Sequence, residues 1–83
     1  MKNETIPTGT VKMKHIEAFN KATGLKVEIA FWLKEKADAL ESGDVIRIDD
    51  AVIELRELDK QLAYAELDMM YYADILKMRN EIL

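Results

Sequence analysis

The chain has 83 residues, no cysteine and a formal net charge of −4. This length allows one domain at most, and the lack of cysteine excludes disulfides, thiolate nucleophiles and cysteine-bound zinc. Hydrophobic residues make up 49% of the chain, although so short a chain buries a small part of its surface when folded alone. We therefore expect self-association or a protein partner to complete the core, and the absence of cysteine suits a cytoplasmic protein.

Charge is divided unevenly along the sequence. Residues 1–26 hold five Lys against two Glu, and residues 27–83 hold seven basic against fourteen acidic residues. An acidic body does not favour binding to nucleic acid or to an anionic membrane. The most apolar window, GLKVEIAFWL at 24–33, is too short to span a bilayer, and the N-terminus has no apolar run typical of a signal peptide. Neither a nucleic acid nor a membrane is expected as a partner.

The first third of the chain predicts a tail followed by a helix. Pro7 and Gly9 indicate an extended N-terminal tail over 1–9, so the folded domain is expected over 10–83. A helix is then predicted over about 10–23, because Met13, Ile16, Phe19 and Thr23 follow helical spacing. The alternation in TVKMKHI leaves a short strand over 11–16 as an alternative. Gly24 either breaks this arm or is a weak point within one longer helix.

A second helical segment is predicted over 25–42. Its expected core face consists of Leu25, Ile29, Leu33, Ala37 and Leu40. Gly43 is typical of a helix C-terminus. Residues 43–49 are then expected to connect to the next helix, with Asp49 or Asp50 as its N-cap.

The last segment carries the strongest periodic pattern in the chain. Leu55, Leu62, Met69, Leu76 and Leu83 repeat every seven residues, and Ala51, Leu58, Ala65 and Tyr72 fill the companion position. Four such repeats are typical of a bundle or coiled coil, and they predict a helix over about 50–81, roughly 48 Å long. The predicted oligomer seam consists of Leu55, Leu58, Leu62, Met69, Tyr72 and Leu76.

Together these elements predict an all-α fold, a long antiparallel helical hairpin that associates into a helical bundle. With a turn centred near residue 45 or 46, residue i is expected to face about residue 91 − i. Large side chains nevertheless outnumber the positions that one partner helix can cover. Two pairs of consecutive large side chains cannot both be covered by one helix: Phe31 with Trp32, and Met70 with Tyr71. These four residues are predicted to be interaction anchors covered by a second copy or another protein.

One segment resembles a known DNA-binding unit. AFNKATGLKVEIAFWLKEK, residues 18–36, is similar to the helix-turn-helix of bacterial and phage repressors, and KATGL is similar to its turn. The resemblance implies a turn at Gly24, a buried Leu25 and Leu33 in the core of a recognition helix, with lysines meeting phosphates. Base-reading helices usually present Arg, Asn, Gln or Ser, whereas this segment presents Glu28 and Phe31.

Candidate metal ligands are sparse in this sequence. His15 is the only histidine, and Lys12 stands where a Glu-x-x-His metal motif needs an acid. Acidic pairs three residues apart, namely Glu35/Asp38, Glu41/Asp44 and Glu54/Glu57, are the pattern that a Mg²⁺-dependent helical carboxylate enzyme would use. Helical pyrophosphohydrolases place ExxE before ExxD, whereas here EKAD precedes ELRE.

The sequence favours a non-enzymatic protein–protein interaction module: a small adaptor, assembly factor or inhibitor that acts through a self-associating hairpin. No catalytic residue, metal or cofactor is expected. The expected partners are a second copy of the chain and another protein. A DNA-binding regulator built on residues 18–36 and a Mg²⁺-dependent enzyme are the alternatives.

Overall fold

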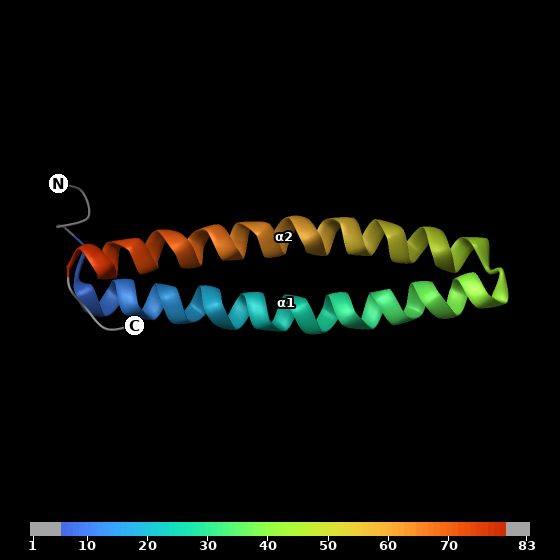
Figure 1. The fold of residues 1–83 in the computed structure, drawn as a ribbon, viewed down its shortest axis with the longest axis horizontal. Helices are drawn as coiled ribbons and strands as arrows, with labels where there is room; N and C mark the ends of the chain where they lie inside the picture. Colours follow the sequence, from blue (N-terminus) through green and yellow to red (C-terminus); the bar gives the residue numbers. More distant parts are fainter. Residues whose placement is uncertain (1–5, 80–83) are drawn as a thin grey trace.

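The computed structural model describes residues 6–79 and shows two long α-helices packed side by side as an antiparallel hairpin (Figure 1). Helix α1 spans Thr8–Ser42 and helix α2 spans Val45–Met78. The hairpin is 55 Å long, 20 Å wide and 14 Å thick between Cα atoms. The predicted all-α hairpin is therefore confirmed.

Both helices differ from their predicted boundaries. Helix α1 begins at Thr8, directly after Pro7, and runs through Gly24 to Ser42 without a break. Of the two alternatives for Gly24, the weak point within one longer helix is confirmed, whereas the break at Gly24 and the alternative strand over 11–16 are wrong. Since a single exposed glycine costs a helix only about 1 kcal/mol, packing along the rest of the helix readily offsets it. Residues 80–83, and with them Leu83 and the predicted C-terminal end at 81, lie outside the described residues.

The connection is shorter than predicted, because only Gly43 and Asp44 separate the helices. Gly43 has a left-handed backbone with φ of 72°. Its N–H donates to Leu40 O at 3.3 Å, and the Asp44 N–H donates to Ala39 O at 3.0 Å, which is the Schellman arrangement. The Asp44 carboxylate in turn accepts from the Arg47 N–H at 3.2 Å. Asp44 is therefore the N-cap of α2, and the prediction of Asp49 or Asp50 is wrong.

The short connection sets which residues lie opposite one another. Because Ser42 and Val45 flank the turn, residue i lies level with residue 87 − i, four positions from the predicted register. Two core clusters agree with this register. One contains Ala22, Leu25, Leu58 and Ala65, and the other contains Val11, Ile75 and Leu76. The seam between the helices thus runs along the full hairpin.

Both helices place alanines as well as large residues along this seam. The buried residues of α1 are Val11, Ala18, Ala22, Leu25 and Ala39. Val11, Ala18, Leu25 and Ala39 belong to one seven-residue repeat, in which the half-buried Trp32 occupies the position between Leu25 and Ala39. Ala22 lies at the companion position, four residues after Ala18. A heptad seam of this kind is the packing of antiparallel coiled coils. The alanines allow the two helices to approach closely.

Candidate interaction surfaces

All six residues of the predicted seam lie on the face of α2 that packs against α1 of the same chain. Leu55, Leu58 and Leu76 are buried. Leu62 and Met69 pack half-buried against the larger core cluster, and Tyr72 packs against the smaller one. The structure thus gives these residues a role within the hairpin. Their contribution to an oligomer remains a prediction.

The four predicted anchors divide into one residue in the seam and three on the surface. Trp32 is half-buried and packs against the larger core cluster. Phe31, Met70 and Tyr71 are 59%, 62% and 55% exposed. Two exposed rings rest edge-on against seam aromatics, Phe31 on Trp32 with ring centroids 5.3 Å apart and Tyr71 on Tyr72 at 5.1 Å. These contacts orient the exposed rings without covering them.

A second apolar stripe lies on α1, outside the seam. Helical spacing places the following residues on one side of α1, which we name the α1 front stripe: Ile16, Phe19, Thr23, Lys26, Ala30, Leu33, Ala37 and Leu40. Ile16, Phe19, Leu33 and Leu40 are 52–57% exposed, so the predicted place of Leu33 and Leu40 in the core is wrong. Met13, one turn earlier on α1, is 61% exposed.

Sequence reasoning missed this stripe because it assigned the largest side chains to the core. The signal that distinguishes the two faces is present in the spacing. A repeat of seven residues runs from Val11 through Ala18 and Leu25, and another runs from Phe19 to Leu33 and Leu40. Burial follows the first repeat, whose members are mostly small. The second repeat follows the first by one residue, which is about 100° around the helix, so it forms a face beside the seam.

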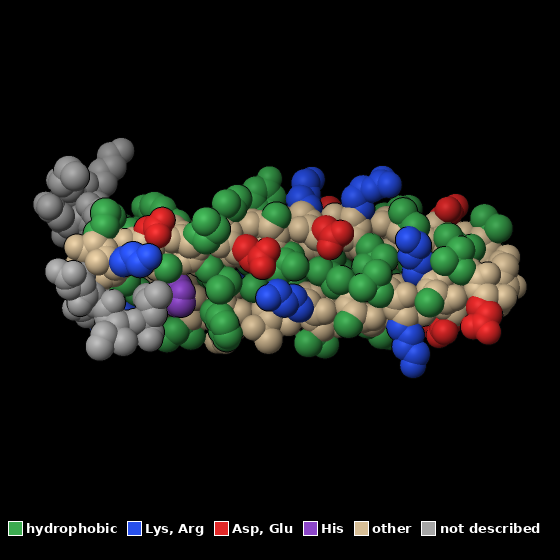
Figure 2. Space-filling model, in the orientation of Figure 1, with side chains coloured by type: hydrophobic (Ala, Val, Ile, Leu, Met, Phe, Trp, Pro, Cys, Tyr) green, Lys and Arg blue, Asp and Glu red, His purple; other side chains and the backbone are tan. Residues whose placement is uncertain are grey.

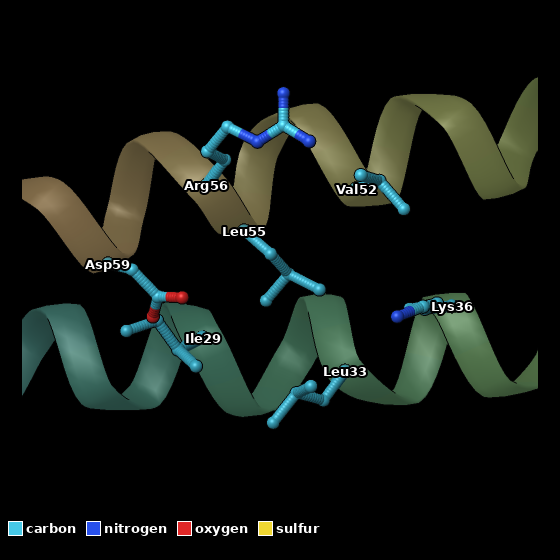
Figure 3. A pocket seen from close by; sticks show the side chains of 7 residues that line it. All are labelled: Ile29, Leu33, Lys36, Val52, Leu55, Arg56 and Asp59. Atoms are coloured by element: carbon cyan, nitrogen blue, oxygen red, sulfur yellow. The ribbon is translucent and has the colours of Figure 1, made fainter.

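Helix α2 contributes to the same face of the hairpin. The α2 front stripe consists of Val45, Asp49, Val52, Arg56, Asp59, Ala63, Glu66, Met70, Ala73 and Lys77. The two stripes meet in an open groove over the seam (Figure 3), where Ile29 and Leu33 of α1 lie across from Val52, Leu55 and Arg56 of α2. Figure 2 looks onto this front face and shows hydrophobic side chains over both helices between scattered charged ones.

The opposite, back face of the hairpin is richer in acidic residues. Positions 14, 21, 28 and 35 of α1 lie on the far side of the seam from the α1 front stripe. Glu35 on this side pairs with Arg47 of α2, with Oε2 and Nη2 3.4 Å apart. A shallow groove here is lined by Lys14, Glu17, Lys21 and Asp68. The two broad faces therefore differ in chemistry, one largely apolar and one charged.

The acidic pairs that suggested a metal enzyme have structural partners or lie on exposed surface. Glu35 forms the ion pair with Arg47, and Asp44 caps α2. Asp38, Glu41, Glu54 and Glu57 are exposed. Among residues 6–79, no three acidic or histidine side chains lie close enough together to hold a metal ion.

The helix-turn-helix geometry implied by the resemblance is absent from residues 18–36. The whole segment lies within α1, without the turn that would set two helices at an angle. Thr23 Oγ1 donates to Phe19 O at 3.0 Å, a hydrogen bond made within a continuing helix. A continuous helix here cannot present the second helix of that unit to a DNA groove.

Two further findings concern membranes and relatives. Neither α1 nor α2, over the part of the chain that is described, has a stretch long and apolar enough to cross a membrane. No protein family matches the sequence, and no curated protein or solved structure is significantly similar to it. The functional argument therefore rests on the surface of the hairpin itself.

Proposed function

We propose that this chain is a non-enzymatic protein–protein interaction module, a small adaptor, assembly factor or inhibitor. The observation that carries the proposal is the large hydrophobic side chains left exposed after the seam is complete. Tyr64, Leu67, Met70 and Tyr71, in two successive turns of α2, are 55–62% exposed. Contiguous apolar surface on a small protein is typical of a site that binds another protein, and tyrosine and methionine are enriched in such sites.

The pattern on α2 separates residues that hold the hairpin from residues offered to a partner. In the run Met69 to Tyr72, the two outer members pack half-buried against the core clusters. The two inner members, Met70 and Tyr71, point away from α1 and are exposed. Since two helices cannot cover all four side chains, a partner is needed to bury the remaining two. A partner helix laid along an apolar stripe is a common form of such recognition.

Substitution of the exposed pair tests the proposal. Met70→Glu and Tyr71→Glu should each alter the solution mass or abolish the capture of a partner from lysate. Both should keep the helical circular-dichroism signal, because neither residue belongs to the buried core. Asn20→Glu, which also adds one negative charge at an exposed helical position, is the matched control and should change neither measurement.

The proposal fails if Met70→Glu and Tyr71→Glu leave both the solution mass and the captured proteins unchanged. A loss of helicity in either variant would instead show that the residue supports the fold. The Asn20→Glu control separates an effect of added charge on an already acidic chain from an effect at the apolar surface.

A further inference from the structure

The front face of the hairpin has the chemistry of an interface between two copies of this chain. The α1 front stripe contains Lys26 as its only charged residue between 16 and 40. The α2 front stripe contains three acids, Asp49, Asp59 and Glu66, against two bases, Arg56 and Lys77. The two stripes therefore carry charge of opposite sign. A copy placed front to front matches them if α1 of each chain lies on α2 of the other.

We infer that a second copy covers the front face, giving a four-helix bundle whose two-fold axis runs along the hairpin. This inference rests on the proposed interaction function and identifies a second copy of the chain as a binding partner. A two-fold axis in this direction keeps residues of equal level together, so α1 of one copy lies antiparallel to α2 of the other. Each helix is then antiparallel to both of its neighbours, the usual up-down arrangement of such bundles.

Apolar residues meet at both ends of this arrangement. Leu33 is level with residue 54, between Val52 and Arg56 of the second copy. At the other end Phe19 is level with residue 68, beside Met70. These levels follow from the intrachain register, because the turn fixes i opposite 87 − i in each copy. Leu33, Phe19 and Met70 are 53%, 52% and 62% exposed in the single chain and would be buried in the pair.

The charged residues meet in the middle. Lys26 is level with residue 61, so it lies between Asp59 and Glu66 of the second copy. Within one chain, the described residues give Lys26 no ion-pair partner within 4 Å. The reversed arrangement, with a two-fold axis across the hairpin, would set α1 on α1 and α2 on α2. Because Lys26 lies near the middle of α1, that arrangement sets Lys26 of one copy against Lys26 of the other, a like-charge contact that disfavours it.

The size of the face is sufficient for a stable dimer. A face 55 Å long and 20 Å wide measures about 1,100 Å², so two copies would bury roughly 2,000 Å² between them, within the range of stable interfaces. The hairpin alone is only 14 Å thick, about one layer of helix. A second layer turns the half-buried side chains of the groove, Ile29 among them, into a closed core.

Thiol cross-linking tests both the partner and its orientation, since the natural chain has no cysteine. Lys26→Cys and Asp59→Cys chains are purified separately, mixed, and treated with a short bis-maleimide. We expect a cross-linked pair of twice the 9.6 kDa chain mass only when both variants are present. The matched control, Lys21→Cys mixed with Asp68→Cys, places thiols on the back face and should give no cross-linked pair.

Charge exchange supplies a second, independent measurement. Lys26→Glu and Asp59→Lys should each weaken the dimer about tenfold in light scattering over a dilution series. The double variant Lys26→Glu with Asp59→Lys restores opposite charges across the interface and should recover most of the loss. If each substitution weakened the dimer only by disturbing its own helix, the double variant would not recover the affinity of the dimer.

The outcomes distinguish this inference from the proposed function. A dimer that forms Lys26→Cys cross-links with itself would overturn the arrangement, because the copies would then be reversed. A monomer at every concentration would overturn the second copy as occupant of the face. In both cases the interaction function is still judged separately, by the Met70→Glu and Tyr71→Glu captures.

Discussion

Gly43 decides how sharply the chain reverses. Its φ of 72° lies in the left-handed region, where a side chain costs about 1–2 kcal/mol. The Schellman hydrogen bonds from the N–H groups of Gly43 and Asp44 end α1, and the carboxylate of the same Asp44 caps the first turn of α2. Consecutive residues thus end one helix and begin the next. This two-residue connection sets the register of the entire seam.

Replacement of this glycine should destabilise the hairpin. We expect Gly43→Ala to lower the free energy of unfolding by about 1–2 kcal/mol, because alanine disfavours the left-handed backbone. The addition of a Cβ meets no atom within 4 Å, so the loss would come from backbone strain and not from a clash. Guanidinium unfolding followed by circular dichroism measures it. Unchanged stability would contradict the left-handed turn.

At the scale of the element, α1 shows how a long helix tolerates a weak residue. Gly24 lies in mid-helix, is exposed, and has open space around its Cα. The seam residues Ala22 and Leu25 on either side are buried, which holds the helix together where its intrinsic propensity is lowest. Most helical stability in proteins comes from such packing rather than from propensity.

The same substitution at Gly24 should have the opposite sign. We expect Gly24→Ala to raise the free energy of unfolding by about 0.5–1 kcal/mol, since alanine is the better helix former and no neighbour obstructs its methyl group. Unfolding under the conditions used for Gly43→Ala gives a direct comparison. A loss of stability at Gly24 would mean that the arm breaks there after all.

At the scale of the whole molecule, large hydrophobic residues lie on both the buried and the exposed faces of the same helix. Leu58 is 4% exposed in the seam, whereas Leu67, nine residues later on α2, is 59% exposed. Two leucine side chains on one helix therefore differ in burial, and only the buried one packs in the core. The seam residues stabilise the hairpin, and the exposed ones are left available for the proposed interaction.

A matched pair of truncations measures this division. Leu58→Ala should cost about 2–5 kcal/mol of stability, because it leaves a cavity in the seam. Leu67→Ala should change stability by about 0.5 kcal/mol or less. Both variants are unfolded in guanidinium at one protein concentration, so that any association affects them equally. Equal losses at the two positions would show that Leu67 is also buried in the protein's solution state.

The sequence by itself determined the fold class, the hairpin and the seam of α2. That seam is readable because its large residues, such as Leu58 and Leu76, recur at heptad spacing and are also the buried ones. The exposure of Met70 and Tyr71 follows from the same spacing, since they fall between seam positions. Local pattern and tertiary packing agree throughout this helix.

Only the tertiary structure decided the core face of α1, its continuity at Gly24 and the length of the turn. Ala18 and Ala22 are buried while Phe19 is exposed, because the positions of α1 that pack against α2 carry the alanines and Phe19 falls beside them. Hydrophobic size alone predicts the reverse. A core is set by complementarity between two surfaces, and the sequence of one helix does not contain the shape of the other. The front face and its groove follow from that choice, since the large residues excluded from the seam remain on the surface.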